Sequence, residues 1–387
     1  MNERNRVHPN GWSRRDVVAG GLKAGAGALV FAISARAIGL SPAIAKVPDK
    51  IIIGRLPFNT EVTLFTGGND AFKEEGLTIE YMEGAGGPAI VQALAAGSIP
   101  VGDIGIGPAL IAAARNLPFV SPAMGAVATP SHPSDRIMVR ADSPIQKVQD
   151  LKGKKLALHQ RGTIEDFELI SMKKKFGVGP DDIDIAIVPI PNQPQVLAEG
   201  QVDAIFPIPP FDLIAERKFK ARTLVNGADI NPYTGYGTFT FRTDFIEAYP
   251  EAAQKLMKAW ILMCRWIDDN PAKAKAASGT QMHVDADMQN DVRLCWFARN
   301  GLPVMPNIWQ FYYWMLSAKL IDSSIDAKKL IDQSVTEPTK RISLPALESI
   351  GVQRDVEIAK MLKADYPALP EPPEKYYGDW EPKMLQL

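Results

Sequence analysis

The sequence predicts an α/β protein of two lobes with extra helices after them. Strand and helix patterns alternate from residue 50 to residue 115, and a second alternation runs from residue 141 to residue 235. Such alternation is typical of largely parallel sheets covered by helices. Helical patterns then dominate between residues 250 and 318. A chain of 387 residues, 46% hydrophobic and 22% charged, is long enough to give each lobe its own core.

The first lobe is predicted from short apolar runs and helix-start signals. Its strands are expected at 50–54, 77–81 and 101–106. Its helices are expected at 61–75, 89–96 and 109–115. Pro88 suits the first turn of the second helix, and Gly97 suits the position just after its end. A strand at 136–140 would then lead out of this lobe.

The second lobe is expected to repeat this construction and to return the chain to the first. Its elements are expected as strands at 156–159, 183–188 and 204–206 and helices at 163–176 and 193–199. A returning strand at 238–241, beside the outgoing one, would complete a two-strand hinge. Further helices are expected at 250–269, 271–277, 285–300, 308–318 and 352–364. We therefore assign 46–138 and 240–340 to lobe 1, 139–239 to lobe 2 and 341–387 to a helical, proline-rich tail.

Residues 1–45 resemble a twin-arginine signal peptide. Arg14 and Arg15 precede a weakly apolar run at 24–35, and Ala43-Ile44-Ala45 offers a small-residue cleavage site. The alternative is a membrane anchor, but this run is shorter than the roughly 20 apolar residues that span a bilayer. We expect export to the periplasm, with cleavage near Lys46.

Composition argues against several functional classes. The formal net charge is −1, which disfavours nucleic acid as a partner. No Ser/His/Asp arrangement, phosphate-binding loop or Cys/His cluster is visible in the sequence, so we predict no catalysis, no metal and no cofactor. Cys264 and Cys295 each lie on an apolar helical face, which leaves buried thiols and a disulfide as alternatives.

The stretch 142–163 is the strongest candidate for a binding site. A short apolar strand ends at His159, and a helix is expected to begin at Thr163 with acidic residues in its first turns. A helix N-terminus at the tip of a strand presents free amides and a positive dipole end, which suits a small anion. Arg161 would form a bidentate pair with a carboxylate or sulfonate, unless its side chain is solvated or pairs with Glu165.

The other candidate contacts also lie in loops that follow strands, where ligands of open α/β sheets bind. Gly86, Gly87 and Gly107 would bring bare backbone amides close to a ligand, although tight turns also explain them. Polar groups from the first loop would complete the site, although they could instead cap a helix. An apolar, partly aromatic wall would face them, although its residues could instead pack in the core. These remaining candidates are Phe58, Asn59, Thr60, Pro209, Phe211, Tyr233 and Tyr236.

Three motifs, in a fixed order, carry a family resemblance. They are GAGGPAIVQALAAG at 84–97, DLKGKK at 150–155, and GQVDA at 200–204 followed by Pro210-Phe211. Together they resemble the substrate-binding proteins of ABC importers in the aliphatic sulfonate, taurine and nitrate group, which are NMT1/THI5-like. The resemblance implies a periplasmic binding protein type 2 fold, a ligand cleft between the lobes, a monomer, and an ABC permease in the inner membrane as partner.

Two departures from the family pattern bear on the ligand. Ile208-Pro209 stands where the pattern "W-D-P-F" has Trp-Asp, and the missing acid argues against an amino-sulfonate. Pro100 stands where the pattern "G-x-I-D" expects Asp. An anion-binding end facing an apolar wall favours a sulfonate or carboxylate on an alkyl or aromatic body over an inorganic ion such as nitrate.

Two other functions share features with this chain. Thiamine-pyrimidine synthases have the same two-lobe fold, but such an enzyme would be cytosolic and would use clustered histidine and cysteine. Here the histidines are scattered, at His8, His132, His159 and His283. A receptor sensor domain would need a downstream transmembrane helix, for which the sequence has no apolar segment. A solute-binding protein is therefore the leading expectation.

Overall fold

The computed structural model describes residues 47–129, 131–231 and 234–352. The predicted signal peptide, Tyr233 and nearly all of the helix predicted at 352–364 lie outside these residues. All the elements described below belong to one unit of the chain, which begins at Val47.

The first of two large sheets has five strands within the described residues. They are β1 (Ile51–Arg55), β2 (Ile79–Glu83), β3 (Val101–Gly105), β4 (Phe119–Met124) and β11 (Gly237–Arg242). The order across the sheet is β2-β1-β3-β11-β4. β1 is parallel to β2 and β3, whereas β11 runs antiparallel to both β3 and β4. The late strand β11 therefore completes a sheet begun almost two hundred residues earlier in the chain.

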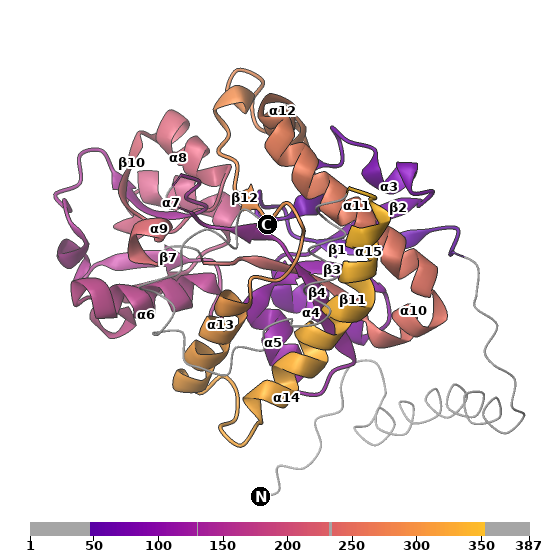
Figure 1. Cartoon of the computed structure of the whole chain (residues 1–387). Coiled ribbons are helices and arrows are strands. Elements are labelled where there is room, and N and C mark those ends of the chain that lie inside the picture. Colours follow the sequence, from indigo (N-terminus) through magenta and orange to yellow (C-terminus); the bar gives the residue numbers. More distant parts are fainter. Residues whose placement is uncertain (1–46, 130, 232–233, 353–387) are drawn as a thin grey trace, which may run out of the picture. The chain divides into compact units, whose positions relative to one another are not determined.

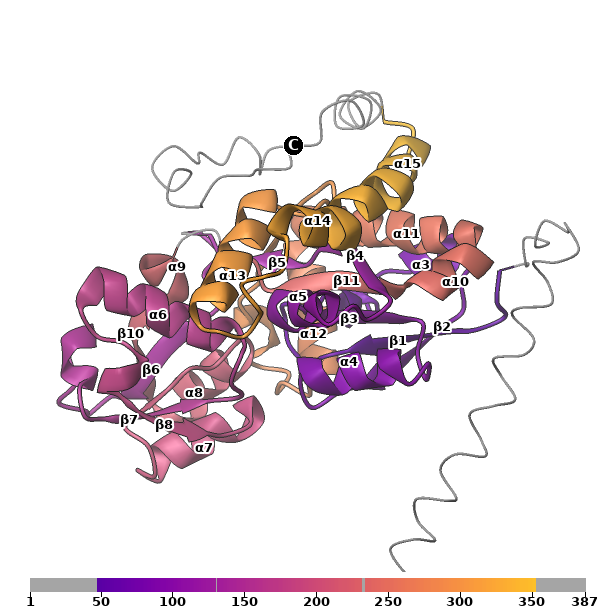
Figure 2. The same cartoon turned by 90° about the horizontal axis from the view of Figure 1, so that it is seen from below.

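The second sheet also has five strands among the residues that the structure describes. They are β6 (Arg136–Arg140), β7 (Lys155–Leu158), β8 (Asp184–Ile187), β9 (Ala204–Ile205) and β10 (Ala221–Asn226). Their order is β10-β6-β9-β7-β8, with β7 parallel to its two neighbours. Both views show this sheet and its helices beside the first sheet (Figures 1 and 2). A short antiparallel pair joins β5 (Ala126–Val127) to β12 (Trp296–Phe297).

Helices flank both sheets. On the second sheet they are α6 (Ile164–Phe176), α7 (Gln193–Ala198), α8 (Phe211–Phe219) and α9 (Gly227–Ile230), with short 3₁₀ turns η3 (Val148–Leu151), η4 (Pro180–Asp182) and η5 (Ile190–Asn192). On the first sheet, before the chain crosses to the second, they are η2 (Val62–Phe65), α3 (Ala71–Glu74), α4 (Gly87–Ala95) and α5 (Ile106–Ala114). The helices that follow β11 are α10 (Thr243–Ala248), α11 (Pro250–Asp269), α12 (Pro271–Gln281), η6 (Gln289–Asp291), α13 (Met305–Ser317), α14 (Ala327–Ile331), the π turns η7 (Asp332–Thr336) and η8 (Thr339–Ser343), and α15 (Leu344–Ser349).

The longest helix, α11, has the bounds that the sequence predicted. Proline stands at its first position, where no backbone N–H is needed. Its apolar face is buried in the core of the first sheet, where Trp260 stacks on Phe239 of β11 with ring centroids 4.3 Å apart. No helix in the described part of the chain combines the length and apolar character that crossing a bilayer requires.

Two predicted helices are wrong. The helix expected at 61–75 is divided into η2 and α3, because Gly67-Gly68 interrupts it. A Cβ at Gly68 would lie 2.7 Å from the Trp266 ring and 2.9 Å from Ala277, so glycine allows the chain to approach α11 and α12 closely. The helix expected at 285–300 is a loop that contains only η6 and β12.

Two segments carry the chain between the sheets, residues 128–135 and 227–236. They lie side by side: the Ala128 N–H donates to the Thr234 carbonyl over 2.8 Å, and the Gly227 N–H donates to the Asp135 carbonyl over 3.0 Å. The lobe boundaries predicted at 138/139 and 239/240 would cut through β6 and β11. We propose that the boundaries fall in the two crossing segments instead.

Candidate functional site

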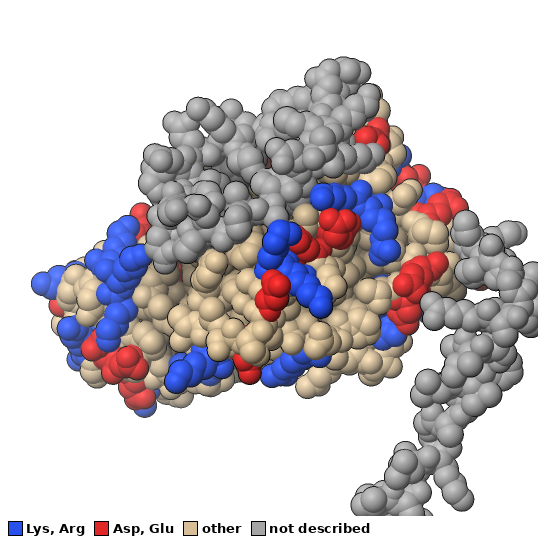
Figure 3. Space-filling view, turned by 60° about the horizontal axis from the view of Figure 1, so that its bottom comes forward, with Lys and Arg blue, Asp and Glu red and all other residues tan. Residues whose placement is uncertain are grey.

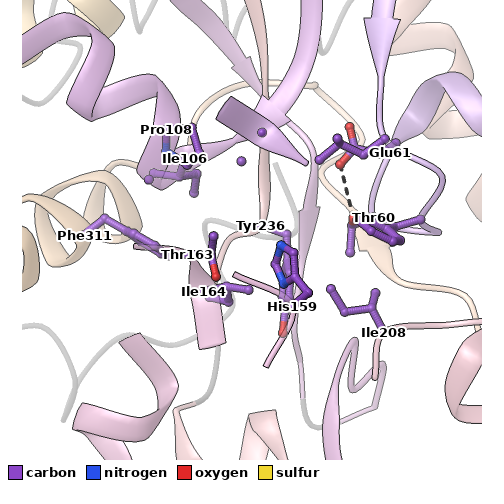
Figure 4. Close-up of a pocket in the computed structure, with 15 residues that line it drawn as sticks. Thr60, Glu61, Ile106, Pro108, His159, Thr163, Ile164, Ile208, Tyr236 and Phe311 are labelled. Atoms are coloured by element: carbon purple, nitrogen blue, oxygen red, sulfur yellow. Dashed lines mark hydrogen bonds between the residues drawn. The ribbon is translucent and has the colours of Figure 1, made fainter. Parts of the chain in front are cut away.

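A pocket of about 50 Å³ lies where loops from both sheets meet (Figure 4). Its lining residues are Leu56, Phe58, Thr60, Glu61, Gly87, Gly105, Ile106, Gly107, Pro108, His159, Thr163, Ile164, Ile208, Tyr236 and Phe311. They end or follow β1, β2, β3, β7 and β9 or begin the helices after these strands, with Tyr236 just before β11 and Phe311 on α13. The pocket thus occupies the edge where the carboxyl ends of parallel strands place their loops.

Three helices begin at this pocket. Gly87 is the first residue of α4, Ile106 is the first residue of α5, and Thr163 is the cap before α6. The first two helices belong to the first sheet and the third to the second sheet. Helix N-termini carry unpaired amides and the positive end of the helix dipole, so their convergence favours negative charge in the pocket.

His159 adds a side chain that can carry positive charge. Its Nδ1 lies 2.5 Å from Glu165 Oε2, and its backbone N–H donates to Glu165 Oε1 over 3.1 Å. Burial lowers the pKa of His159, but the charge and hydrogen bond of Glu165, with the charge of Asp166, outweigh burial and raise the pKa above 6.5. The ring packs edge-on against Phe58, with centroids 6.2 Å apart. Glu165 thereby both orients the imidazole and favours its charged form.

Glu61 and Asp103 form a buried carboxyl pair beside the pocket. Thr60 Oγ1 donates to Glu61 Oε1 over 3.2 Å, and Thr63 Oγ1 donates to Asp103 Oδ2 over 3.2 Å. Burial, then the charge and hydrogen bond of Asp103, hold the pKa of Glu61 well above its usual value. Burial also raises the pKa of Asp103, to about 6. The pair therefore retains a proton near neutral pH, which limits its repulsion of an anion.

Six of the predicted contact residues line the pocket, namely Phe58, Thr60, Gly87, Gly107, Thr163 and Tyr236. Gly86 directly precedes the lining residue Gly87. A Cβ on Gly86 would lie 2.5 Å from Oε1 of Gln160, which follows β7 in the second lobe. Pro209 and Phe211 follow the lining residue Ile208, and the Pro209–Pro210 peptide is cis. Their roles in ligand contact stay predictions.

Two predicted contacts lie away from the lining. Arg161 Nε lies 3.2 Å from Asp166 Oδ1, with the arginine side chain 56% exposed. Asp166 also accepts a hydrogen bond from the Gly162 N–H over 2.5 Å, so this acid pairs with both a side chain and a backbone amide of the loop before α6. Asn59 is fully buried, and its side-chain amide donates to the Arg293 carbonyl over 3.0 Å.

The sequence did not single out several lining residues. Glu61 directly follows Thr60, and the sequence predicts it only as the start of a helix. The sequence predicts His159 only as the end of a strand, and its pairing with Glu165 depends on how the loop between them folds. Phe311 lies on α13, where its ring stacks on Phe167 of α6 with centroids 4.7 Å apart. No sequence pattern connects α13 to a pocket assembled so far away in the chain.

The two cysteines do not contribute to this site. Both are buried free thiols, and they line a separate cavity of about 170 Å³ together with His132 and Asp268. Among the described residues, no group of three or more His, Cys, Asp or Glu is arranged to hold a metal ion.

Charge on the surface is mixed. On the face shown in Figure 3, basic and acidic side chains are interspersed over the described residues. This face therefore shows no extended patch of one charge sign that would attract an anion.

Comparison with known proteins places this geometry in context. A Bacillus subtilis (strain 168) protein named as an aliphatic sulfonates-binding protein is 24% identical over 273 residues, which are 68% of this chain and 79% of its own length. The alkanesulfonate-binding protein SsuA from Xanthomonas axonopodis pv. citri, solved with MOPS bound, superposes with a TM-score of 0.61 at 22% identity, covering 75% of this chain and 99% of its own.

A third relative extends the likeness to a different ligand. The periplasmic nitrate-binding protein NrtA from Synechocystis PCC 6803 superposes with a TM-score of 0.65 at 14% identity, covering 84% of this chain and 92% of its own. These likenesses confirm the predicted two-lobe periplasmic binding protein fold. The family described as NMT1/THI5 like matches residues 69–274, which is more than half of the 387 residues. The chain therefore belongs to the NMT1/THI5-like family, as its three motifs predicted.

Proposed function

We propose that the protein is the exported solute-binding component of an ABC importer, and that it captures a small organic anion in the pocket between its lobes. The observation that carries this proposal is the convergence of three helix N-termini, from α4, α5 and α6, on one pocket. Because these termini come from both sheets, an anion held there contacts both lobes at once.

The anionic group is held by helix amides, by the His159 imidazolium and by nearby hydroxyls. Thr60 and Thr163 supply the hydroxyls within the lining. Neither Lys nor Arg stands among the described lining residues, so the full positive charge comes from His159. A sulfonate or carboxylate, with two or three oxygens to share among these donors, matches this arrangement.

The rest of the lining favours an apolar body on the ligand. Leu56, Phe58, Ile106, Ile208 and Phe311 face the same pocket. Nitrate would leave these side chains without a partner, whereas a short alkyl group would cover them. The volume of about 50 Å³ favours such a small body over an aromatic ring. The names of the relatives, which refer to sulfonates and nitrate, support an oxyanion as the common element.

Delivery to a membrane permease from the periplasm follows from this role. The periplasmic relative NrtA and the signal-like residues 1–45 support an exported protein. We propose that it acts as a monomer and that it performs no catalysis, because trapping and release of one small solute needs only the two lobes and the pocket.

A thermal-shift panel tests the proposal. Protein purified without refolding is heated with ethanesulfonate, hexanesulfonate, benzoate, nitrate or sulfate. A ligand at 100 times its dissociation constant stabilises a protein by about 2.7 kcal/mol, which gives a clear rise in melting temperature. We expect a sulfonate or carboxylate to produce this rise. A response to nitrate alone would contradict the apolar-body argument, and no response to any organic anion would overturn the proposed ligand class.

A further inference from the structure

Residues 282–294, called here the latch segment, connect the first sheet's helices to the second lobe. The segment follows α12 and is anchored to it: the Val284 N–H donates to the Gly279 carbonyl over 2.8 Å, and Lys275 Nζ donates to the Asn290 carbonyl over 3.1 Å. α12 in turn packs on α11 and η2 of the first lobe. The latch segment therefore belongs structurally to the first lobe.

The other side of the latch segment contacts α8 of the second lobe through exposed ion pairs. Arg217 Nη2 lies 2.5 Å from Asp291 Oδ2, and Lys218 Nζ lies 2.8 Å from Asp285 Oδ2. Beneath these pairs, Leu213 of α8 shares a buried apolar cluster with Val284, Met288 and Val292. Met288 and Val292 were part of the apolar spacing that predicted a helix at 285–300, and here they serve this contact instead.

A deeper part of the contact centres on Arg293. Its guanidinium lies 2.5 Å from Glu216 Oε2 and 3.0 Å from Asp212 Oδ2, both on α8. Asp212 is fully buried and also lies 3.1 Å from Arg136 Nε, at the start of β6. Loss of Arg293 would therefore leave Asp212 with one cationic partner, and the carboxylate would not become an unpaired buried charge.

Asn59 connects this contact to the pocket. Its side-chain amide donates to the Arg293 carbonyl, and its backbone N–H donates to the Pro209 carbonyl of the second lobe over 3.2 Å. The residues on either side of it, Phe58 and Thr60, line the pocket. One loop thus holds the ligand pocket, the latch segment and the second lobe in fixed relation.

We infer that the latch segment and α8 form an electrostatic latch that holds the lobes closed over the ligand and sets its rate of release, with Arg293 and Asn59 as positioning residues. The inference rests on the proposed function. Nearly all lining side chains are buried, so a ligand passes in or out only when the lobes part. When the lobes part, α8 separates from the latch segment, and Arg217, Lys218 and Arg293 lose their carboxylate partners. Each release of ligand therefore requires that these ion pairs break.

The test compares latch variants with a matched control by stopped-flow measurement of ethanesulfonate association and dissociation. The variants are the double change Arg217→Ala with Lys218→Ala, and the single change Arg293→Ala. The control is Arg299→Ala, which removes an arginine that also pairs with two carboxylates, Asp268 and Asp269, but within the first lobe.

We expect the double variant to release ethanesulfonate about threefold to tenfold faster, since each exposed ion pair contributes modestly. Arg293→Ala should release it at least about tenfold faster, as loss of a hydrogen-bonded charge pair acts mainly on dissociation. Raising the ionic strength from about 0.05 M to 0.5 M should speed release from the parent and change the double variant much less. Arg299→Ala should match the parent in both respects.

A second measurement makes the outcome independent of ligand identity. Hydrogen exchange of the free protein should be faster in α8 and in residues 282–294 for both latch variants, and unchanged for Arg299→Ala. If ethanesulfonate binds but release and exchange match the parent in both variants, the latch is overturned while the proposed function stands. If ethanesulfonate does not bind the parent, the exchange result alone decides the latch, and an unchanged α8 would overturn it.

Discussion

His159 shows how a single side chain sets the electrostatics of the pocket. Within the described lining it is the residue able to carry a full positive charge, and its charge is maintained by Glu165 on α6. The sequence instead directed attention to Arg161, because guanidinium is the usual partner of sulfonates and carboxylates. In the structure Asp166, five residues further on, pairs with that arginine at the surface.

Comparing His159→Gln with Arg161→Ala tests which cation serves the anion. Glutamine keeps a donor but loses the charge, and loss of a charged hydrogen bond typically costs about 1.5–3 kcal/mol, so affinity should fall roughly tenfold to a hundredfold. If Arg161 were the cation at the site, as the sequence favours, that loss would belong to Arg161→Ala. The exposed ion pair leads us to expect less than about a threefold loss. Calorimetry with ethanesulfonate at pH 6 measures both, and equal affinities of parent and His159→Gln would exclude the imidazolium.

The same residue gives the binding a pH dependence. Because the pKa of His159 is raised above its ordinary value, the imidazolium is present below that ordinary value and is lost as pH rises through the raised pKa. Anion affinity should therefore be flat on the acid side and decline on the basic side. His159→Gln should make this decline smaller, and the part that remains comes from loss of the proton held by Glu61 and Asp103. Titrations of the parent and the variant from pH 6 to pH 9 measure the difference.

At the scale of elements, α5 illustrates what sequence patterns predict well and what they miss. Its strand-helix boundary near Gly105 and Gly107 was predicted, since glycine and proline mark the turn. What could not be predicted is the neighbour: a Cβ on Gly107 would lie 3.0 Å from the Gly162 carbonyl oxygen of the second lobe and 3.1 Å from Met315 Cε. Glycine at this position thus lets two backbones from different lobes approach closely.

Gly107→Ala should therefore weaken closure more than folding. The φ of Gly107 lies outside the left-handed region, and alanine suits a helix, so thermal stability of the free protein should change little. Contact with a backbone oxygen at 3.0 Å cannot be relieved by a side-chain rotation, so the lobes must stay slightly apart and ligand should dissociate faster. Melting temperature and dissociation rate, measured on the same preparation, separate the two effects; an unchanged rate would contradict the close approach.

Local signals explain why other elements were predicted correctly or wrongly. α11 begins at a proline and carries one continuous apolar face into a single core, so periodicity alone determines it. Residues 285–300 have a similar apolar spacing, but it serves the contact with Leu213 on a helix some seventy residues earlier. The same limit applies to the pocket, since Phe311 reaches it from α13, a segment that carries no site motif.

At the scale of the whole molecule, buried acids collect near the two crossing segments. Asp135 lies in the first, and burial raises its pKa to about 7 against the opposing effects of Tyr236 and Arg136. Glu168 of α6 has a pKa raised well above its usual value by burial and by the charge of Asp135. With Glu61 and Asp103, these groups hold protons in the folded protein that an unfolded chain would release at lower pH.

Stability should consequently decrease as the pH rises. For an acid whose folded pKa is above its unfolded value, the contribution is fully present below the unfolded pKa, near 3.8 for aspartate, and is lost through about 6 for Asp103 and about 7 for Asp135. Urea unfolding should give a larger free energy at pH 5.5 than at pH 8. Asp135→Asn should flatten this slope, whereas Asp184→Asn on the exposed edge strand β8 should retain it. A free energy that increases towards pH 8 would contradict the assignment.

The paired crossing segments also determine what kind of movement the fold permits. Backbone hydrogen bonds between two segments resist sliding of one segment along the other. Ala128 and Gly227 each make such a bond with the opposite segment, so the two crossings are joined to each other. We expect opening of the lobes to be a hinge motion about this joined pair of segments. The proposed permease would then distinguish a loaded protein from an open one by the angle of that hinge.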